Sequence, residues 1–333
     1  MVTLPPLHLS NISDASHSRI FLKLENMQPS GSFKIRGIGN LMKTAVLHTQ
    51  KSRSPPLHFY CSSGGNAGLA CATVAKMISH HATIVVPRST SQLLVRKLRD
   101  LSAEVIQIGE NLAAADLYLR KELIGCDSNG FYVPPFDHPI IWAGQESLLS
   151  EVYDQMAEKG GFDAVVCSVG GGSMLIGIQQ TIKKRVAASG GPAPMVLAVE
   201  TRGAESLNAS LISGRHMTLE KITSIATSLG VSRVAEKAYE WAQEKNVRSI
   251  VLSDAEAAMG CVRFADEERI LVETSCGVSL AAVYNGALRR ELGKGMGDEE
   301  WARIKVVVSV CGGSDVTLER LEEYRERYCC ETL

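Results

Sequence analysis

Short apolar runs alternate with longer segments that carry an apolar stripe along nearly the whole chain. Most of the runs end at Gly, Pro or Ser, and together they predict strands over 20–24, 57–61, 82–86, 103–108, 131–133, 164–168, 195–200, 249–252, 270–272 and 305–310. The segments between them predict helices over 33–48, 69–78, 92–98, 112–124, 142–159, 174–187, 206–212, 234–244, 254–266, 277–290 and from 317, with Ser91 and Asp254 as N-caps. This alternation indicates an α/β fold with mainly parallel sheets.

Composition sets the scale of the protein and removes several classes of partner. The chain has 333 residues, 45% hydrophobic and 21% charged, which suits one large or two medium-sized globular domains. A net charge of −1 without a basic block argues against a nucleic acid partner, and so does an aromatic content of 5%. No apolar run is long enough to span a membrane, so we expect no membrane partner.

The nine cysteines are scattered without the spacing of a zinc site, and several lie inside apolar runs. Buried, reduced thiols in an intracellular protein explain this usage better than a disulfide framework. The first residues show neither the apolar core of a signal peptide nor an arginine-rich presequence. We therefore expect a cytoplasmic protein, with mitochondria as the alternative. The rigid segment 134–139 is the expected crossing between two domains.

Glycine-rich turns follow three of the predicted strands, at 62–68, 170–173 and 311–314. Ligands of open α/β sheets bind beyond the carboxyl ends of the strands, and glycines let the backbone approach them closely. Gly170-Gly171-Gly172-Ser173 opens a helix and is the best candidate for a phosphate cradle, although a tight strand–helix turn would look the same. It is not a Walker loop, since no Lys-Ser/Thr follows. Glu200 lies too far away for the dinucleotide fingerprint.

Lys34 stands behind a Ser/Gly turn at the start of a predicted helix. A lysine held still and partly desolvated there could act as a nucleophile or base, whereas most lysines at helix starts are solvated charges. A lysine together with a phosphate cradle, without metal ligands or a catalytic triad, suggests a phosphorylated aldehyde held as a Schiff base, which is pyridoxal phosphate.

Other candidate residues keep an ordinary explanation beside a functional one. Asn66 could bind a ligand through its amide or could simply cap a helix. Cys311 could face a ligand or be a buried apolar thiol. His138 and Trp142 fit packing of the connector better than catalysis. Three acids near strand ends cannot be separated from capping or solvated acids: Glu200, Asp266 and Glu273.

Several motifs closely resemble those of the catabolic L-serine/L-threonine dehydratases, which are pyridoxal-phosphate enzymes of fold type II, the tryptophan synthase β-like fold. The resemblance runs from about 21 to 321 and rests on Pro-Ser-Gly-Ser-Phe-Lys-Ile-Arg-Gly at 29–37, Ser-Ser-Gly-Gly-Asn-Ala-Gly at 62–68, Pro-Pro-Phe-Asp-His-Pro at 134–139, Val-Gly-Gly-Gly at 169–172, Leu-Gly-Val at 229–231 and Val-Cys-Gly-Gly-Ser at 310–314. It implies two three-layer α/β/α domains with the active site between them. The large domain would comprise 1–32 and 136–333, and the small domain 33–135.

The resemblance also implies roles for the matching residues. Lys34 would carry the cofactor and act as the catalytic base, Phe33 would cover one face of the pyridine ring, and Asn66 would bind the ring hydroxyl. Cys311 would meet the pyridine nitrogen. The phosphate would be bound by Gly170, Gly171, Gly172 and Ser173, and the substrate carboxylate by Ser63, Gly64, Gly65, Asn66 and Ala67. A monovalent-cation site, for K⁺, would use backbone carbonyls at Gly170, Ala204, Leu229 and Val231.

The implied activity is that of an L-serine ammonia-lyase, which forms pyruvate and ammonia by β-elimination and also converts threonine to 2-oxobutyrate. The family further implies a homodimer active in amino-acid catabolism and gluconeogenesis. A serine racemase, threonine synthase or cysteine synthase of the same fold is an alternative, although racemases usually carry His where this chain has Ala67. A nicotinamide-dependent dehydrogenase and a pyridoxal-phosphate-binding protein without turnover are alternatives from other classes.

The chain departs from the family pattern at four positions. Ser173 replaces the last of four glycines in the phosphate turn, and Gly64 stands where some members have Ala. Ser228 stands where some members have Ala over the second ring face, and Thr274 where Pro is common. The first two departures concern the pocket, so the preference between serine and threonine stays open. We expect no effector domain after the catalytic part, which resembles the catabolic enzymes.

Overall fold

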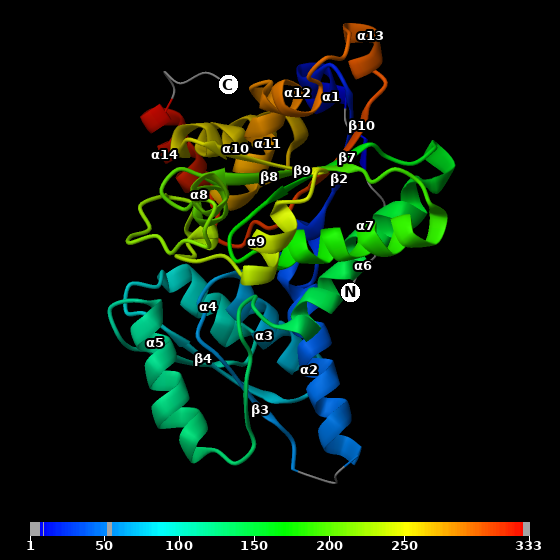
Figure 1. Cartoon of the computed structure of the whole chain (residues 1–333). Helices are drawn as coiled ribbons and strands as arrows, with labels where there is room; N and C mark the ends of the chain where they lie inside the picture. Colours follow the sequence, from blue (N-terminus) through cyan, green and yellow to red (C-terminus); the bar gives the residue numbers. More distant parts are fainter. Residues whose placement is uncertain (1–6, 9, 52–54, 329–333) are drawn as a thin grey trace. The chain divides into compact units, whose positions relative to one another are not determined.

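The computed structural model describes residues 7–8, 10–51 and 55–328, and it divides into two compact units. The small unit comprises residues 27–145, and the large unit comprises the described residues up to 26 and from 146 onward. The inserted domain expected at 33–135 falls within the range of the small unit. Figure 1 draws most of the small unit in blue to blue-green.

The small unit is built on a parallel sheet with the strand order β5-β4-β3-β6. His58 pairs with His81 on one side and with Gly130 on the other, so the strands begin at a common edge. The strands were all expected from their apolar runs, and their bounds are β3 (His58–Cys61), β4 (His81–Val86), β5 (Glu104–Gln107) and β6 (Gly130–Tyr132).

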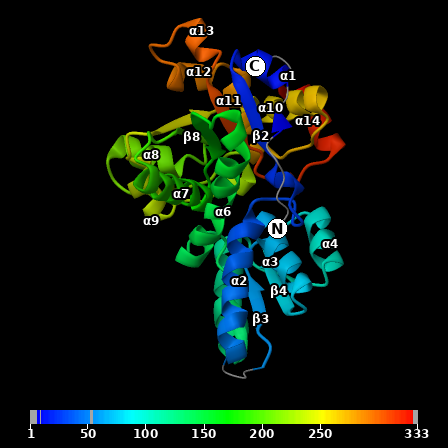
Figure 2. The same cartoon turned by 90° about the vertical axis from the view of Figure 1, so that its right-hand side faces the viewer.

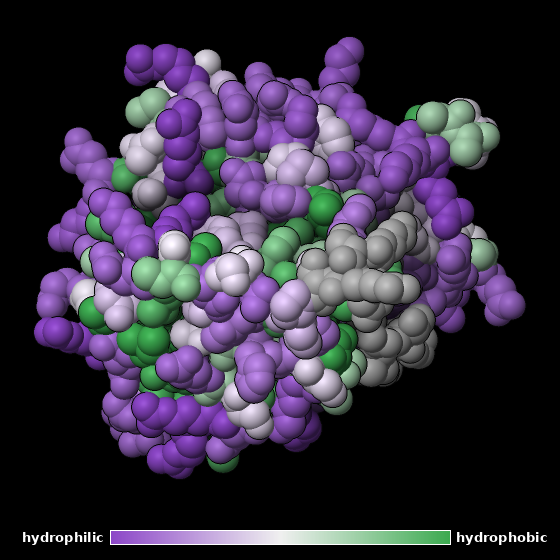
Figure 3. All heavy atoms as spheres, turned by 90° about the horizontal axis from the view of Figure 1, so that it is seen from below, coloured by the Kyte–Doolittle hydropathy of each residue, from purple (hydrophilic) through white to green (hydrophobic). Residues whose placement is uncertain are grey.

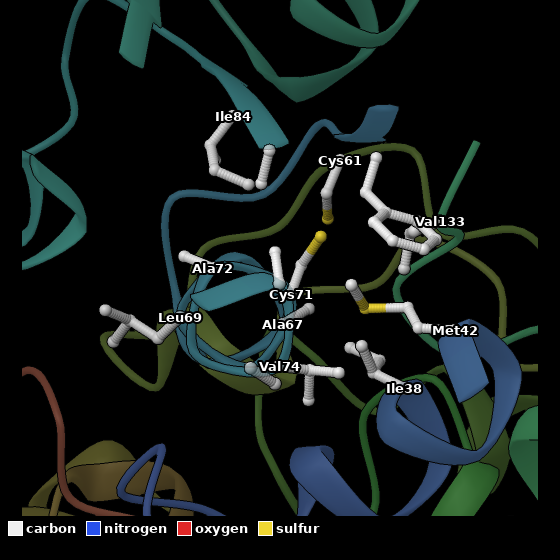
Figure 4. Close-up of a cluster of buried hydrophobic side chains, with 14 of the residues drawn as sticks. Ile38, Met42, Cys61, Ala67, Leu69, Cys71, Ala72, Val74, Ile84 and Val133 are labelled. Carbon is white, nitrogen blue, oxygen red and sulfur yellow. The ribbon is translucent and has the colours of Figure 1, made fainter. Parts of the chain in front are cut away.

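Side chains of this sheet alternate between two cores because successive strand residues point to opposite faces. Phe59 and Cys61 belong to the core beneath α2 (Lys34–Lys51), α3 (Asn66–Met77) and α4 (Gln92–Asp100). Tyr60 belongs to the core beneath α5 (Leu112–Tyr118). Figure 4 shows Ile38 and Met42 of α2 facing the Ala67, Cys71 and Val74 side of α3, so helix α2 is fixed against α3 by apolar packing.

The large unit is built on a sheet with the strand order β1-β2-β10-β7-β8-β9. Only the β1–β2 pairing among these described strands is antiparallel. Ile20 pairs with Val306, so strands from the two ends of the chain are neighbours. The strand bounds are β1 (Leu7–His8), β2 (Arg19–Lys23), β7 (Ala164–Ser168), β8 (Met195–Thr201), β9 (Val247–Leu252) and β10 (Lys305–Ser309).

Helices cover both faces of the large sheet. In Figures 1 and 2, α7 (Ser173–Ser189) and α9 (Glu236–Ala242) lie on one face, and α10 (Asp254–Glu268) and α11 (Thr274–Tyr284) on the other. The layered α/β fold with mainly parallel sheets is therefore confirmed.

The other helices are α1 (Ser10–Ser16), α6 (Pro139–Met156), α8 (Ser206–Ser213), α12 (Ala287–Leu292), α13 (Asp298–Trp301) and α14 (Leu318–Tyr328). Short helical turns are η1 (Glu25–Met27), η2 (Leu119–Leu123), η3 (Ile124–Cys126), η4 (Ala157–Lys159) and η5 (Thr227–Leu229).

Several sequence-based expectations are wrong in detail. The apolar run 270–272 is not a strand. It lies beside residues 312–313, but a single backbone hydrogen bond, from Glu273 N to Gly312 O, stands in place of the ladder of hydrogen bonds that a strand requires. The helix expected over 277–290 is interrupted by Gly286, whose φ is 75°. Ser253, not Asp254, caps α10, and Glu256 completes a capping box with it. The helix expected over 112–124 changes to π geometry at 119.

The expectation of reduced, buried thiols is confirmed for the described cysteines. Each of them is free, and all but Cys126 are buried; Cys329 and Cys330 lie outside the described residues. Within the part of the chain that the structure describes, no helix combines the length and apolar character that crossing a membrane requires. The face drawn in Figure 3 is mostly hydrophilic, with hydrophobic side chains scattered between polar ones.

Candidate active site

Lys34 is the first residue of α2, directly after a turn in which Gly31 has a φ of 74° and donates to Gln28 O at 2.7 Å. Its side chain is half-buried, and Nζ donates a hydrogen bond to the carbonyl oxygen of Pro135 at 2.9 Å. Nζ also lies 5.5 Å from the centre of the Phe33 ring and 5.8 Å from that of Phe136. The amine is thus held in a defined place within the small unit.

The Lys34 amine lies against the connector 134–139. Trp142 Nε1 donates to the carbonyl oxygen of Phe136 at 3.1 Å, and His138 Nδ1 accepts from Ile140 N at 3.1 Å. Asn40, on the helix that carries Lys34, donates to Ile140 O at 2.8 Å. His138 and Trp142 therefore organise the connector, as their local sequence suggests.

The turn after β3 leads directly into α3. Gly65 stands at the N-cap position and Asn66 is the first helical residue, so the alternative role of Asn66 as an ordinary N-cap is wrong. No side chain caps this helix start, which leaves its first amides directed toward the turn. A Cβ on Gly68 would lie 1.7 Å from the carbonyl oxygen of Ser63, so only glycine fits at this position. Backbone amides gathered in this way suit a carboxylate.

Asp116 holds the beginning of that turn, and sequence reasoning missed it. Its Oδ1 accepts hydrogen bonds from Ser62 Oγ at 2.6 Å and from Tyr132 OH at 2.7 Å, and Oδ2 accepts from Arg120 Nε at 2.7 Å. Burial acts to raise the pKa of Asp116, but these three hydrogen bonds outweigh burial and hold its pKa below the ordinary value. Burial, followed by the bond to Asp116, raises the pKa of Tyr132 to about 12. A lone aspartate on a helix gave no signal in the sequence.

In the large unit, residues 170–173 connect β7 to α7. Gly172 has a φ of 88° at the N-cap of α7, with no side chain capping the helix. A Cβ on Gly172 would lie 2.5 Å from Ala238 Cβ and 2.9 Å from Val234 Cγ2, and Ala235 N donates to Gly171 O at 3.1 Å. The turn is therefore fixed from behind by the start of α9. Uncapped amides at the start of a long helix, in a turn without room for side chains, fit a phosphate group.

Cys311 follows β10 and is 4% exposed. Its Sγ lies 3.4 Å from Ser168 Oγ and donates to Ser275 O at 3.7 Å. Because β10 and β7 are adjacent and parallel, Cys311 and the turn at 170–173 lie at the same edge of the large sheet. The structure thus brings together two of the glycine turns singled out in the sequence. Burial raises the pKa of the neighbouring Cys167 thiol to about 12.

The carbonyls expected to bind a cation lie partly against the phosphate turn. A Cβ on Gly170 would contact Leu229 Cα at 3.0 Å and Leu229 O at 3.4 Å. Leu229 ends η5, Val231 N donates to Leu229 O at 2.7 Å, and Ala204 is fully buried. Among the described residues, no group of three or more His, Cys, Asp or Glu side chains could hold a metal ion.

Glu200, Asp266 and Glu273, the acids to which the sequence assigned no role, have distinct surroundings. Glu200 is fully buried and accepts from two amides of α8, Leu207 N at 2.9 Å and Asn208 N at 2.8 Å. Burial raises the pKa of Glu200 to about 8, against the lowering effect of these two bonds. Asp266 forms an exposed ion pair with Arg325. Glu273 is buried at the start of α11 and accepts from Ser275 Oγ at 2.5 Å.

Comparison with known proteins places the chain in a family. Residues 3–312 match the family described as pyridoxal-phosphate dependent enzyme, and the chain therefore belongs to it. Among curated relatives, it is 41% identical to L-serine dehydratase/L-threonine deaminase of Bos taurus, over 95% of this chain and 94% of that protein. It is 36% identical to the catabolic L-serine/threonine dehydratase of Saccharomyces cerevisiae, over 92% of this chain and 86% of that protein.

Solved structures give the same grouping. A fungal L-serine ammonia-lyase from Rhizomucor miehei superimposes with a TM-score of 0.87 at 35% identity, covering 98% of each chain. Maize serine racemase superimposes with a TM-score of 0.81 at 22% identity, covering 98% of this chain and 93% of that one. The second likeness concerns the fold alone.

Proposed function

We propose that this protein is a pyridoxal-phosphate-dependent L-serine dehydratase that also deaminates L-threonine. The observation that carries the proposal is the edge of the large sheet, where a helix start with uncapped amides lies beside the buried thiol of Cys311. An acid at the ring nitrogen would favour a long-lived carbanion, whereas a thiol favours rapid loss of the β-substituent. The similarity to serine dehydratases over most of the chain supports the same activity.

Each residue of the proposed active site has a distinct role. The bound cofactor supplies an electron sink for the pair left on the substrate Cα after proton removal. Lys34 carries the cofactor and takes the Cα proton at Nζ. Amides of the turn at 63–67 bind the substrate carboxylate, with Asn66 facing the ring hydroxyl and Phe33 covering one ring face. Gly170 to Ser173 hold the phosphate by their amides.

The overall change removes the Cα hydrogen and the β-hydroxyl of serine as water. The released 2-aminoacrylate takes up water and yields pyruvate and ammonia, and threonine yields 2-oxobutyrate in the same way. We also propose that backbone carbonyls at Gly170, Ala204, Leu229 and Val231 bind K⁺ and brace the phosphate turn. The contact between Gly170 and Leu229 supports this placement. A cytoplasmic homodimer acting in amino-acid catabolism and gluconeogenesis completes the proposal and rests on the family resemblance.

A coupled assay for pyruvate and 2-oxobutyrate on the purified protein tests the proposal, with serine and threonine, with and without K⁺. We expect both products, faster in K⁺, and no turnover with Lys34→Ala. Formation of D-serine without pyruvate would indicate a racemase instead, and substantial activity of Lys34→Ala would refute the assignment of the lysine. Size-exclusion chromatography with light scattering tests the dimer.

A further inference from the structure

The Lys34 amine rests in an environment that suits its charged form. Pro135 O accepts its hydrogen bond at 2.9 Å, and the ring centres of Phe33 and Phe136 lie 5.5 Å and 5.8 Å from Nζ. A carbonyl oxygen and the face of an aromatic ring both attract an ammonium more strongly than a neutral amine. Phe33 already has a role in the proposed site as cover for the pyridine ring. Phe136 has no role there, although its ring is nearly as close to Nζ.

The connector holds Phe136 in this place. Its carbonyl oxygen accepts from Trp142 Nε1 at 3.1 Å and from His138 N at 3.2 Å. The two prolines before it restrict the backbone. The bond from Asn40 to Ile140 O ties the end of the connector to α2, the helix that begins with Lys34. The distance between the ring and the amine is thus set by fixed elements of one unit.

We infer that Phe136, together with the carbonyl of Pro135, is a positioning residue for the protonated form of Lys34. The inference rests on the proposed function. When Lys34 takes the Cα proton, its amine becomes an ammonium, and these two groups hold that ammonium in place. A proton stabilised on Nζ returns to Cα less readily, so the electron pair on Cα instead forms the Cα–Cβ double bond while the Cβ–O bond breaks. The leaving oxygen takes a proton from solvent and departs as water, and Nζ later releases its own proton to solvent. Phe136 thereby favours elimination over return to serine.

A first experiment measures the pKa of the Lys34 amine in the full-length protein freed of pyridoxal phosphate. The rate of reaction with an amine-directed acylating reagent is followed against pH, and labelling of Lys34 is quantified by mass spectrometry. Phe136→Leu should lower this pKa by about half a unit to one unit, because the ring attraction is lost while the apolar volume stays. Phe136→Tyr keeps a ring and should leave the pKa unchanged.

Phe131→Leu is the matched control for loss of a phenyl ring. Phe131 packs on Phe59 in the same unit, 5.9 Å between ring centres, and serves the core beneath α2 and α3. The Phe131→Leu substitution should leave the pKa of the Lys34 amine unchanged. The charged and titratable residues next along the chain to Lys34 and Phe136, which are Arg36, Asp137 and His138, are unchanged in all variants. An unchanged pKa in Phe136→Leu, or an equal fall in Phe131→Leu, would overturn the inference.

A second experiment uses the holoenzyme in deuterated water. The ratio of deuterium incorporated into recovered serine to pyruvate formed should rise about two- to fivefold in Phe136→Leu, and stay at the parent value in Phe136→Tyr. A ratio that does not rise contradicts the role of the ring. Absence of pyruvate from every variant, including the parent protein, would instead refute the proposed function, while the labelling experiment would still decide the role of Phe136.

Discussion

Gly68 and Ser63 are in such close contact that a Cβ on Gly68 would stand 1.7 Å from the Ser63 carbonyl oxygen and 2.9 Å from its carbonyl carbon. Both atoms belong to the backbone, so neither can swing aside as the end of a side chain could. The first turn of α3 therefore fixes the peptide at Ser63. The position of the amides proposed to bind the substrate carboxylate depends on the absence of a single methyl group.

We expect Gly68→Ala to shift this peptide and to raise KM for serine about tenfold or more, the equivalent of roughly 1.4 kcal/mol. Steady-state kinetics with a pyruvate assay checks this. Gly39→Ala is the control, since its Cβ would meet Val74 Cγ2 at an ordinary 3.5 Å and its helix gains from alanine. An unchanged KM in Gly68→Ala would show that the turn tolerates displacement.

Substitution of Gly172 should weaken binding of pyridoxal phosphate. Its φ of 88° is unfavourable for alanine by about 1–2 kcal/mol. In addition, the methyl group would crowd Ala238 at 2.5 Å. We expect the Kd for the cofactor in Gly172→Ala, measured by absorbance titration, to rise about tenfold or more. Gly190→Ala is the control for a methyl group at a positive φ in the same helix, because Gly190 has a φ of 68° at the other end of α7 and open space around its Cβ. This variant should leave the Kd for the cofactor unchanged. Equal Kd values in both variants would contradict the crowding argument.

Glu200 should make the stability of the protein fall at mildly alkaline pH. Burial raises its pKa to about 8 in the folded protein, compared with an ordinary value of 4.5. The folded state therefore holds the proton more tightly than the unfolded state. The resulting stability is complete below pH 4.5 and is lost as the pH rises toward and through 8. The loss amounts to at most about 5 kcal/mol.

Denaturant midpoints measured between pH 5 and 9, in buffers without K⁺ or Na⁺, test this expectation. Glu200→Gln removes the titrating group, so its midpoints should decline less with pH than those of the parent protein. Parallel pH profiles for the two proteins would show that Glu200 does not titrate in this range. Asp266→Asn, which changes an exposed acid, should leave the profile of the parent protein almost intact.

The alternation of apolar runs with amphipathic segments was sufficient to predict the layered fold, because most of the strands are apolar runs that a Gly, Pro or Ser follows within a few residues. The run at 270–272 misled the prediction, since apolar character alone does not provide a neighbouring strand. Val272 is buried without a ladder, while Leu271 is partly exposed. To form a strand, residues 270–272 would need a neighbouring strand with which to pair. The glycine backbone at 312–313 lies beside them but is joined to this segment by one backbone hydrogen bond, from Glu273 N to Gly312 O.

The candidate site was predictable where glycine marked a close backbone approach, as at Gly68 and Gly172. Asp116 could not be found in this way, because its three hydrogen bonds come from side chains on a strand end, a neighbouring strand and its own helix. Only the fold brings these groups together. The surroundings of Lys34 were equally hidden, since Pro135 and Phe136 reach it from about a hundred residues further along the chain.

The pairing of β2 with β10 has a consequence for how the protein is made. Residues 19–23 leave the ribosome early, yet one of their two neighbours in the sheet, residues 305–309, is synthesised much later. Until then one edge of β2 stays unpaired and accessible to another nascent chain. We expect the large unit to depend on chaperones during translation, whereas the small unit, whose strands all lie between 58 and 132, can assemble while the ribosome is still at work.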